Sequence, residues 1–189
     1  MSKPSSGHFQ GTTGSVLSMV LTSNQSEFIT AHNSDIIDSK KLDTREHPTK
    51  YKQLSSKKLQ SLRQKEENRT ITKAEYKHKE WQRRLTARRN EAIKKFWKAE
   101  KRRIKHNLPT TRNWSAEQRK DILSNKRPKY DGKPMASHHT YSVSKYPHLS
   151  NKPELIYPVT LYEHIYGWHG GNTKNSLPGK PIKNYKPQF

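Results

Sequence analysis

HHTYSVSKYPHLSNKPELIYPVTLYEHIYGWHGGN, residues 138–172, is the stretch of sequence that decides the fold. A short strand is predicted over Met135–His139, immediately before and into this stretch, and the apolar run Glu154–Val159 predicts a second strand. Thr160 then caps a short helix, with Glu163 as the reciprocal cap three residues later. A strand, a loop, a second strand and a capped helix in this order predict a small hairpin-helix unit.

Histidines are concentrated in the same stretch, where five of the ten in the chain lie between His138 and His169. His138 and His139 are adjacent, and neighbouring side chains of a strand point to opposite faces, so the two should have different roles. One can bind a metal ion while the other faces substrate or water. Imidazole binds zinc and nickel well, and magnesium or manganese with help from water and phosphate. A neutral histidine is also the usual general base near neutral pH.

A pair of adjacent histidines alone is more often two surface residues, but the residues that follow change this reading. Together they resemble the HNH family of ββα-metal nucleases, in particular the C-terminal toxin modules of bacterial polymorphic-toxin systems. The resemblance is carried by the histidine pair, Asn151, the run from Glu154 to Glu163-His164, and Trp168-His169-Gly170-Gly171-Asn172. Upstream, Trp114-Ser115-Ala116-Glu117-Gln118 and Arg127-Pro128 are similar to segments that often precede such modules. The resemblance covers about residues 110–180.

The resemblance implies a role for each matching residue. His139 is then the general base that activates water, and Asn151 braces the loop so that the base is oriented. His138 stands at a metal-ligand position, and His164 matches the ligand at the start of the helix. His169 is a second helix histidine that binds the metal or a phosphate. It lies five residues after His164, whereas four would place both on one α-helical face, and this leaves its role open. The implied cofactor is a divalent ion: Mg, Mn, Zn or Ni.

Charge is distributed unevenly along a chain whose net charge is +22 over 189 residues. Residues 41–130 have 29 basic and 10 acidic side chains, a net charge of +19. Such a block indicates a polyanionic partner, because binding phosphates releases their counterions. Nucleic acid and an anionic membrane surface are the two candidates. A merely solvated helix face is the weaker interpretation.

A long basic helix is predicted in the middle of the chain. Thr72 and Glu75 form a capping box at its start, no Gly or Pro occurs from Lys73 to His106, and Pro109 ends it. A thin apolar stripe follows helical spacing through Trp81, Leu85, Ala92, Phe96 and Ala99. We interpret the stripe as packing against the domain and the remaining faces as surfaces for phosphates or water. The predicted nucleic-acid contacts are Arg83, Arg84, Arg88, Arg89, Lys94, Lys95, Arg102 and Arg103 on this helix, with Asn172 and Lys174 beyond the histidines. Gly170-Gly171-Asn172 offers backbone amides to a substrate or, alternatively, stops the helix.

These observations predict an α+β fold in three parts. Residues 1–70 are a polar linker or irregular N-terminal region, with short strands around Val16–Leu21 and Phe28–Ile29 and a weak helical tendency around Ser55–Asn68. Residues 71–108 form the long basic helix, and residues 110–189 form an HNH-type nuclease domain with a short capped helix from Ser115. Hydrophobic residues make up only 29% of the chain, so a compact core must come from a minority of it.

Several classes are excluded by composition. The chain has no cysteine, which excludes disulfides, thiol nucleophiles and cysteine-bound zinc. No apolar run approaches the roughly 18 residues needed to span a bilayer, so membrane insertion is not expected. The first residues contain no readable export signal.

The hypothesis that follows is a metal-dependent HNH endonuclease that hydrolyses nucleic-acid phosphodiester bonds, with DNA favoured over RNA. The resemblance implies a toxin module of a bacterial competition system, secreted or delivered into a target cell and active in its cytoplasm, and a cognate immunity protein. The alternative is a non-catalytic basic nucleic-acid-binding or structural protein of the ribosomal type. A basic amphipathic membrane binder is a third hypothesis, disfavoured because aromatic residues do not gather on one face of the long helix.

Overall fold

The computed structural model describes residues 42–185. The elements in chain order are α2 (Ser56–Glu67), α3 (Lys73–Lys105), α4 (Ala116–Leu123), β1 (Lys129–Tyr130), β2 (Lys133–Pro134), β3 (Ala136–His139), η1 (Pro147–Leu149), η2 (Pro153–Leu155), β4 (Ile156–Val159) and η3 (Glu163–Trp168). Helices combined with two small antiparallel strand pairs make the described part α+β, as predicted. The strands expected around Val16–Leu21 and Phe28–Ile29 lie outside the described residues.

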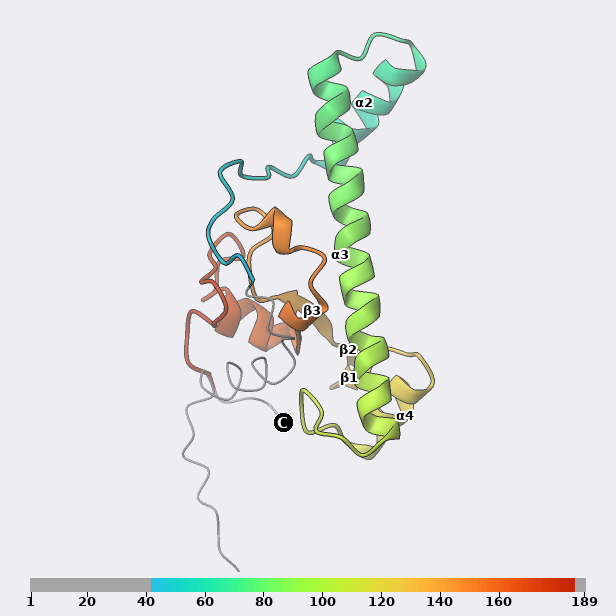
Figure 1. The fold of residues 1–189 in the computed structure, drawn as a ribbon, viewed down its shortest axis with the longest axis vertical. Coiled ribbons are helices and arrows are strands. Elements are labelled where there is room, and N and C mark those ends of the chain that lie inside the picture. Colours follow the sequence, from blue (N-terminus) through green and yellow to red (C-terminus); the bar gives the residue numbers. More distant parts are fainter. Residues whose placement is uncertain (1–41, 186–189) are drawn as a thin grey trace, which may run out of the picture.

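Helix α3 is the scaffold along which the other elements are arranged (Figure 1). It begins with the predicted capping box, in which Glu75 N donates to Thr72 Oγ1 and Thr72 N donates to Glu75 Oε2, both at 3.2 Å. Helix α2 folds back against the N-terminal half of α3, and α4 packs near its C-terminal end. The β3–β4 pair lies beside its middle. The expected helical tendency around Ser55–Asn68 is thus confirmed as a full helix, whereas the division into three domains remains a prediction.

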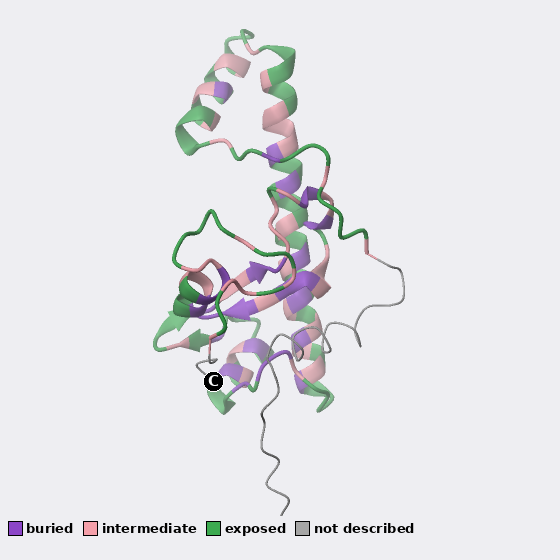
Figure 2. Ribbon diagram, turned by 90° about the vertical axis from the view of Figure 1, so that its left-hand side faces the viewer, coloured by how far each residue is buried: buried purple, intermediate pink, exposed green. Residues whose placement is uncertain are grey.

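One side of α3 carries most of its buried residues (Figure 2). Ala92 and Phe96 pack against Ile156 of β4, and Ile104 joins a second cluster with Ile122 of α4. The predicted apolar stripe is therefore packing against the domain. Two of its members nevertheless remain partly exposed, Trp81 and Ala99.

Glu100 is buried on this same side of α3, which a pattern of apolar residues does not predict. Its carboxylate accepts hydrogen bonds from Thr111 N at 2.7 Å and Trp114 Nε1 at 2.6 Å. Arg103 Nη1 donates to it at 2.6 Å. These bonds replace the water that burial removes, so the carboxylate attaches the segment after α3 back onto the helix.

The hairpin-helix unit predicted from the histidine-rich stretch is present. Strands β3 and β4 pair antiparallel, with Ala136 opposite Val159 at one end and His139 opposite Ile156 at the other. Beyond β4, Thr160 and Glu163 form the expected cap, since Thr160 N donates to Glu163 Oε2 at 2.8 Å and Glu163 N to Thr160 Oγ1 at 3.2 Å. Within residues 42–185, no helix is both long and apolar enough to cross a membrane.

Candidate metal centre

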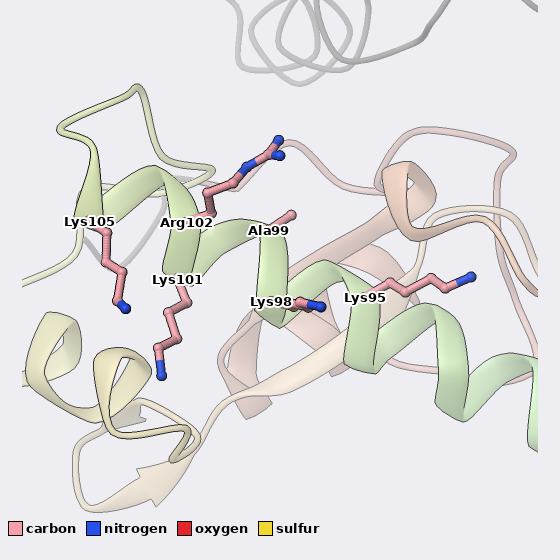
Figure 3. A pocket seen from close by; sticks show the side chains of 6 residues that line it. All are labelled: Lys95, Lys98, Ala99, Lys101, Arg102 and Lys105. Carbon is pink, nitrogen blue, oxygen red and sulfur yellow. The ribbon is translucent and has the colours of Figure 1, made fainter.

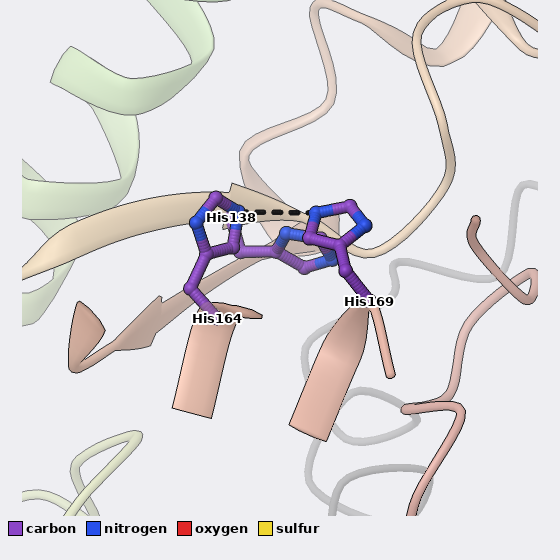
Figure 4. A group of neighbouring side chains, drawn as sticks. All are labelled: His138, His164 and His169. Carbon is purple, nitrogen blue, oxygen red and sulfur yellow. Dashed lines mark hydrogen bonds between the residues drawn. The ribbon is translucent and has the colours of Figure 1, made fainter. Parts of the chain in front are cut away.

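Three histidines from β3 and the helix that follows β4 converge on one point (Figure 4). One ring nitrogen from each of His138, His164 and His169 lies within 4.8 Å of the other two. The Nε2 atoms of His164 and His169 are 3.3 Å apart, and the His138 ring centroid is 5.0 Å from that of His164 and 5.2 Å from that of His169. The structure therefore brings together the three residues that the sequence named as metal ligands.

The last of these residues joins the cluster because its helix is a π-helix. His169 N donates to His164 O at 3.2 Å, which is the bond between residues five apart that defines this helix type. Five residues then make about one turn, so both side chains leave the same face. The spacing that left the role of His169 open in an α-helix is accounted for by the π-helix. Such turns are rare in proteins, and those that do occur are often found at functional sites.

Residues around the cluster orient the rings. His169 Nδ1 lies 2.6 Å from the carbonyl oxygen of Asn175, and a carbonyl only accepts, so Nδ1 carries the proton of the neutral ring and Nε2 presents its lone pair to the cluster. The His138 ring lies against Trp168, with 4.4 Å between centroids. Burial, reinforced by the neighbouring imidazoles, lowers the pKa of His138 to about 2. The ring is therefore neutral at physiological pH, which is the form that binds a metal.

This donor set fits a divalent metal ion. Two nitrogens bound to one zinc ion at tetrahedral angles lie about 3.3 Å apart, and the two Nε2 atoms of His164 and His169 have that separation, 3.3 Å. Three imidazoles leave a coordination position for water or substrate, as catalytic rather than structural zinc sites do. The cluster contains no carboxylate, so the ion would keep its full positive charge toward an approaching phosphate.

His139 points to the face of β3 opposite His138, toward α3, and is only 9% exposed. Its Nε2 lies 3.3 Å from the carbonyl oxygen of Ser150, so Nε2 carries the proton and Nδ1 is the basic nitrogen. Burial and, secondarily, the positive charge of Arg89 lower the pKa of His139 to about 4, against the opposing effect of the Ser150 bond. The ring is neutral at pH 7, as a general base must be.

Asn151 follows Ser150 in the loop and is exposed. Its Oδ1 accepts a hydrogen bond from Arg88 Nη2 at 3.2 Å, and the same Nη2 donates to the His148 carbonyl at 3.3 Å. Asn151 therefore connects the loop to α3, while the loop contacts the His139 ring through the backbone of Ser150.

A buried ion pair that the sequence did not indicate holds the start of the histidine-bearing helix. Arg112 donates to Glu163 through Nη1 at 2.6 Å and Nη2 at 2.8 Å, and also to the Pro158 carbonyl at 3.0 Å. The two side chains are 2% and 0% exposed. Glu163 was recognised as a helix cap, but nothing distinguishes Arg112 from the many other arginines of the chain.

The predicted nucleic-acid contacts occupy different environments. Arg89 is only partly exposed, and its Nε is buried with no hydrogen-bond partner among the described residues. The side chain of Arg103 is 13% exposed and neutralises Glu100, so we leave it out of the proposed interface. Gly171 N donates to Ile165 O at 2.8 Å, which ends the helix there. The others are exposed: Arg83, Arg84, Arg88, Lys94, Lys95, Arg102, Asn172 and Lys174.

Comparison with known proteins identifies one sequence family. Residues 79–160 match the family described as GHH signature containing HNH/Endo VII superfamily nuclease toxin, which confirms the resemblance drawn from the residues. The adjacent histidines of this span are His138 and His139, preceded by Ser137 where the signature's name has glycine. His164 and His169 follow the matched span. No curated protein matches the chain.

Proposed function

We propose that this chain, which over residues 79–160 is similar to HNH/Endo VII superfamily nuclease toxins, is a metal-dependent endonuclease. The family match indicates a nuclease toxin and hence a phosphodiesterase. The observation that carries the metal dependence is the convergence of His138, His164 and His169 within 4.8 Å. Magnesium, manganese, zinc and nickel are the candidate ions, and we propose DNA as the preferred substrate over RNA.

His139 is the proposed general base. The Ser150 carbonyl holds its Nε2–H, which leaves Nδ1 to accept a proton from the attacking water. The oxygen of that water then bonds to phosphorus, and the bond from phosphorus to the leaving oxygen breaks. A bound divalent ion would supply Lewis-acid stabilisation of the charge that builds on the phosphate.

Arg89 and Arg88 are the proposed supporting residues on the α3 side. The positive charge of Arg89 favours a neutral His139, and its side chain is partly exposed, so we propose that it also attracts a substrate phosphate. Arg88 holds Asn151, the residue after Ser150. We propose that this bond keeps the loop, and with it the Ser150 carbonyl, in register with the base.

The biological setting is proposed from the toxin family. The chain would act on nucleic acid in the cytoplasm of a target cell after secretion or delivery, as the toxin module of a bacterial competition system. A producing cell would need a cognate immunity protein. The alternative, a non-catalytic nucleic-acid-binding protein, accounts for the charge, but gripping phosphates does not require three imidazoles around one point.

The test is cleavage of plasmid DNA and of RNA after chelation and re-addition of each ion. We expect cleavage only with metal. His139→Ala should reduce the cleavage rate by about 10²–10⁴-fold, the usual contribution of a general base, while calorimetry still detects metal binding. His164→Ala should lose both, and the exposed His106→Ala is the matched control. Cleavage that resists chelation, or that persists in His139→Ala, would contradict the proposal.

A further inference from the structure

A groove lined by α3, the end of α4 and the segment that follows α4 adjoins a second basin, which among the described residues is lined by α3 alone. The groove has a volume of about 700 Å³ and the second basin about 440 Å³, and both are open to solvent. Three apolar side chains line the larger basin, namely Ile93, Trp97 and Ile122. Around them stand five cations: Lys94, Lys98, Lys101, Lys126 and Arg127. No carboxylate is among the described residues that line either basin.

The aromatic ring of the groove is held in place. Trp97 is partly exposed, and its Nε1 donates to Ser137 Oγ at 2.9 Å. Phe96 packs against the indole edge-on, with 5.1 Å between ring centroids. A fixed indole in a cationic groove offers a flat apolar surface at low entropic cost, since its orientation is already determined.

The side chains of the smaller basin all come from α3 (Figure 3). It is lined by Lys95, Lys98, Ala99, Lys101, Arg102 and Lys105. Lys98 and Lys101 line both basins, so the positive charge is continuous from one to the other. Trp97 links the groove to β3 through its bond to Ser137, and Ser137 lies on the same face of β3 as His139.

We propose that this groove binds an unpaired segment of the nucleic-acid substrate, with a base against Trp97 and the phosphates on the lysines. The inference rests on the proposed function for the nature of the substrate. Every base has a π-face that stacks on an aromatic side chain, whereas in a duplex those faces are covered by neighbouring base pairs. A basin of about 700 Å³ has the size of a small-molecule site. A stable protein interface needs about 800 Å² from each partner, and three apolar side chains do not provide its centre.

Binding is tested on the full chain in chelator, so that the probe is not cut. The probes are fluorescently labelled single-stranded DNA and RNA of twelve nucleotides, and the matching DNA duplex. Their binding is measured by fluorescence anisotropy over a range of salt concentrations. The groove variant is Lys94→Glu, Lys98→Glu and Lys126→Glu. The control variant makes the same change of charge at exposed lysines outside the groove: Lys57→Glu, Lys73→Glu and Lys77→Glu.

For single strands, each lost phosphate contact reduces the slope of log affinity against log salt concentration by about 0.7. The slope of the groove variant should therefore be smaller by about 2. The control variant should lose less than half of this, and the groove variant should weaken single-strand binding more than duplex binding. Equal losses of single-strand affinity in the two variants would overturn the proposal, because the groove would then act only through net charge. Unchanged affinity in the groove variant would also overturn the proposal and would favour an acidic protein as the partner that binds the groove.

The stacking contact is tested at Trp97. Trp97→Leu should weaken single-strand binding by about 5- to 150-fold, the range of one base stacked on an aromatic ring. Trp97→Phe should restore most of the affinity, since it keeps a π-face while losing the bond to Ser137. Circular dichroism and metal binding check that both variants are folded. Equal affinities of folded Leu and Phe variants would overturn the stacking.

These outcomes are independent of cleavage. If no metal supports cleavage but the groove variant selectively loses single-strand affinity, the nuclease proposal fails and the binding site stands. If cleavage is metal-dependent and the groove variant binds like the control, the groove proposal fails alone.

Discussion

The same four-residue pattern, Thr-x-x-Glu, opens a helix in two regions of this molecule, and the two glutamates have opposite environments. Glu75 opens α3 at the exposed end of the α2–α3 pair, where its carboxylate meets Lys65 at 2.7 Å and Lys58 at 3.2 Å with 21% of its side chain exposed. Glu163 opens the histidine-bearing helix, where it is 0% exposed and paired with Arg112.

The difference shows that the cap forms from neighbouring residues alone, whereas its contribution to stability depends on the surrounding fold. Water screens the ions around Glu75, so pairs of this kind contribute little. Around Glu163 no water replaces a missing partner, so removing either charge leaves the other buried and unpaired. Substitution of Glu75 should therefore be tolerated, whereas substitution of Glu163 should not.

The largest effect is expected for Glu163→Gln. Glutamine can still cap the helix, but it leaves the Arg112 guanidinium buried without its counter-ion, at a cost of about 3–5 kcal/mol in the free energy of unfolding. Urea denaturation measures this, with Glu75→Gln as the matched variant, for which a much smaller loss is expected because solvent screens its partners. Equal losses in the two variants would show that burial does not separate the two glutamates.

Metal binding should stabilise only through the histidine cluster. At a metal concentration 100 times Kd, the free energy of unfolding should rise by about 2.7 kcal/mol. Thermal denaturation with and without metal measures the rise, which His164→Ala should abolish and Glu75→Gln should leave intact. An undiminished rise in His164→Ala would place the ion elsewhere.

Acid should begin to act on the two regions at different pH values when metal is chelated. The pKa values of buried His138 and His139 are lowered from 6.5 to about 2 and about 4, so below pH 6.5 the unfolded chain takes up protons that the folded chain does not. Stability therefore falls with pH, by about 2 kcal/mol between pH 6.5 and 5.5 for the two groups together.

The pKa of Glu75 is lowered from 4.5 to about 2, chiefly by its hydrogen bond with Lys65. Its stabilising contribution is complete above pH 4.5 and is lost as pH falls toward 2. Unfolding free energies across pH should show that Glu75→Gln alters only this lower window, and that His139→Gln reduces the slope above it. A flat profile between pH 6.5 and 5.5 would contradict the burial of the histidines.

The smallest effect is expected for Lys65→Met. Its ion pair with Glu75 is partly open to solvent, with the two side chains 41% and 21% exposed, so the loss should be at most about 1 kcal/mol. Because salt screens exposed charges, the difference from the native chain should vanish in urea titrations at about 1 M salt, where the Debye length is about 3 Å. A difference that survives high salt would mean that this pair behaves like the buried one.

Local patterns predicted the elements well. The boundaries of α3 followed from Thr72, Glu75 and the absence of Gly and Pro, and the hairpin followed from two apolar runs separated by a proline-containing loop. The crowding of histidines together with the family resemblance pointed to His138, His164 and His169, which the fold brings within 4.8 Å of one another. The role of each remains a proposal.

Partners distant in the chain were not predicted. Glu100 is one of several acidic residues on a charged helix, and only the packing of residues 111 and 114 against α3 shows that it is buried. Arg112 lies 51 residues from Glu163. Trp97 was absent from the predicted apolar stripe, and its contact with Ser137 exists only because β3 crosses α3 at that point.

The sequence by itself determined which segments are helix or strand and which residues are candidates for the site, because capping, side-chain periodicity and residue type act over a few neighbouring residues. The tertiary structure alone decided that the five-residue step from His164 to His169 makes about one turn, that Glu163 is buried against Arg112, and that burial lowers the pKa of His139. The physical reason is desolvation: whether an ionisable group keeps its water depends on segments that meet only in the folded molecule.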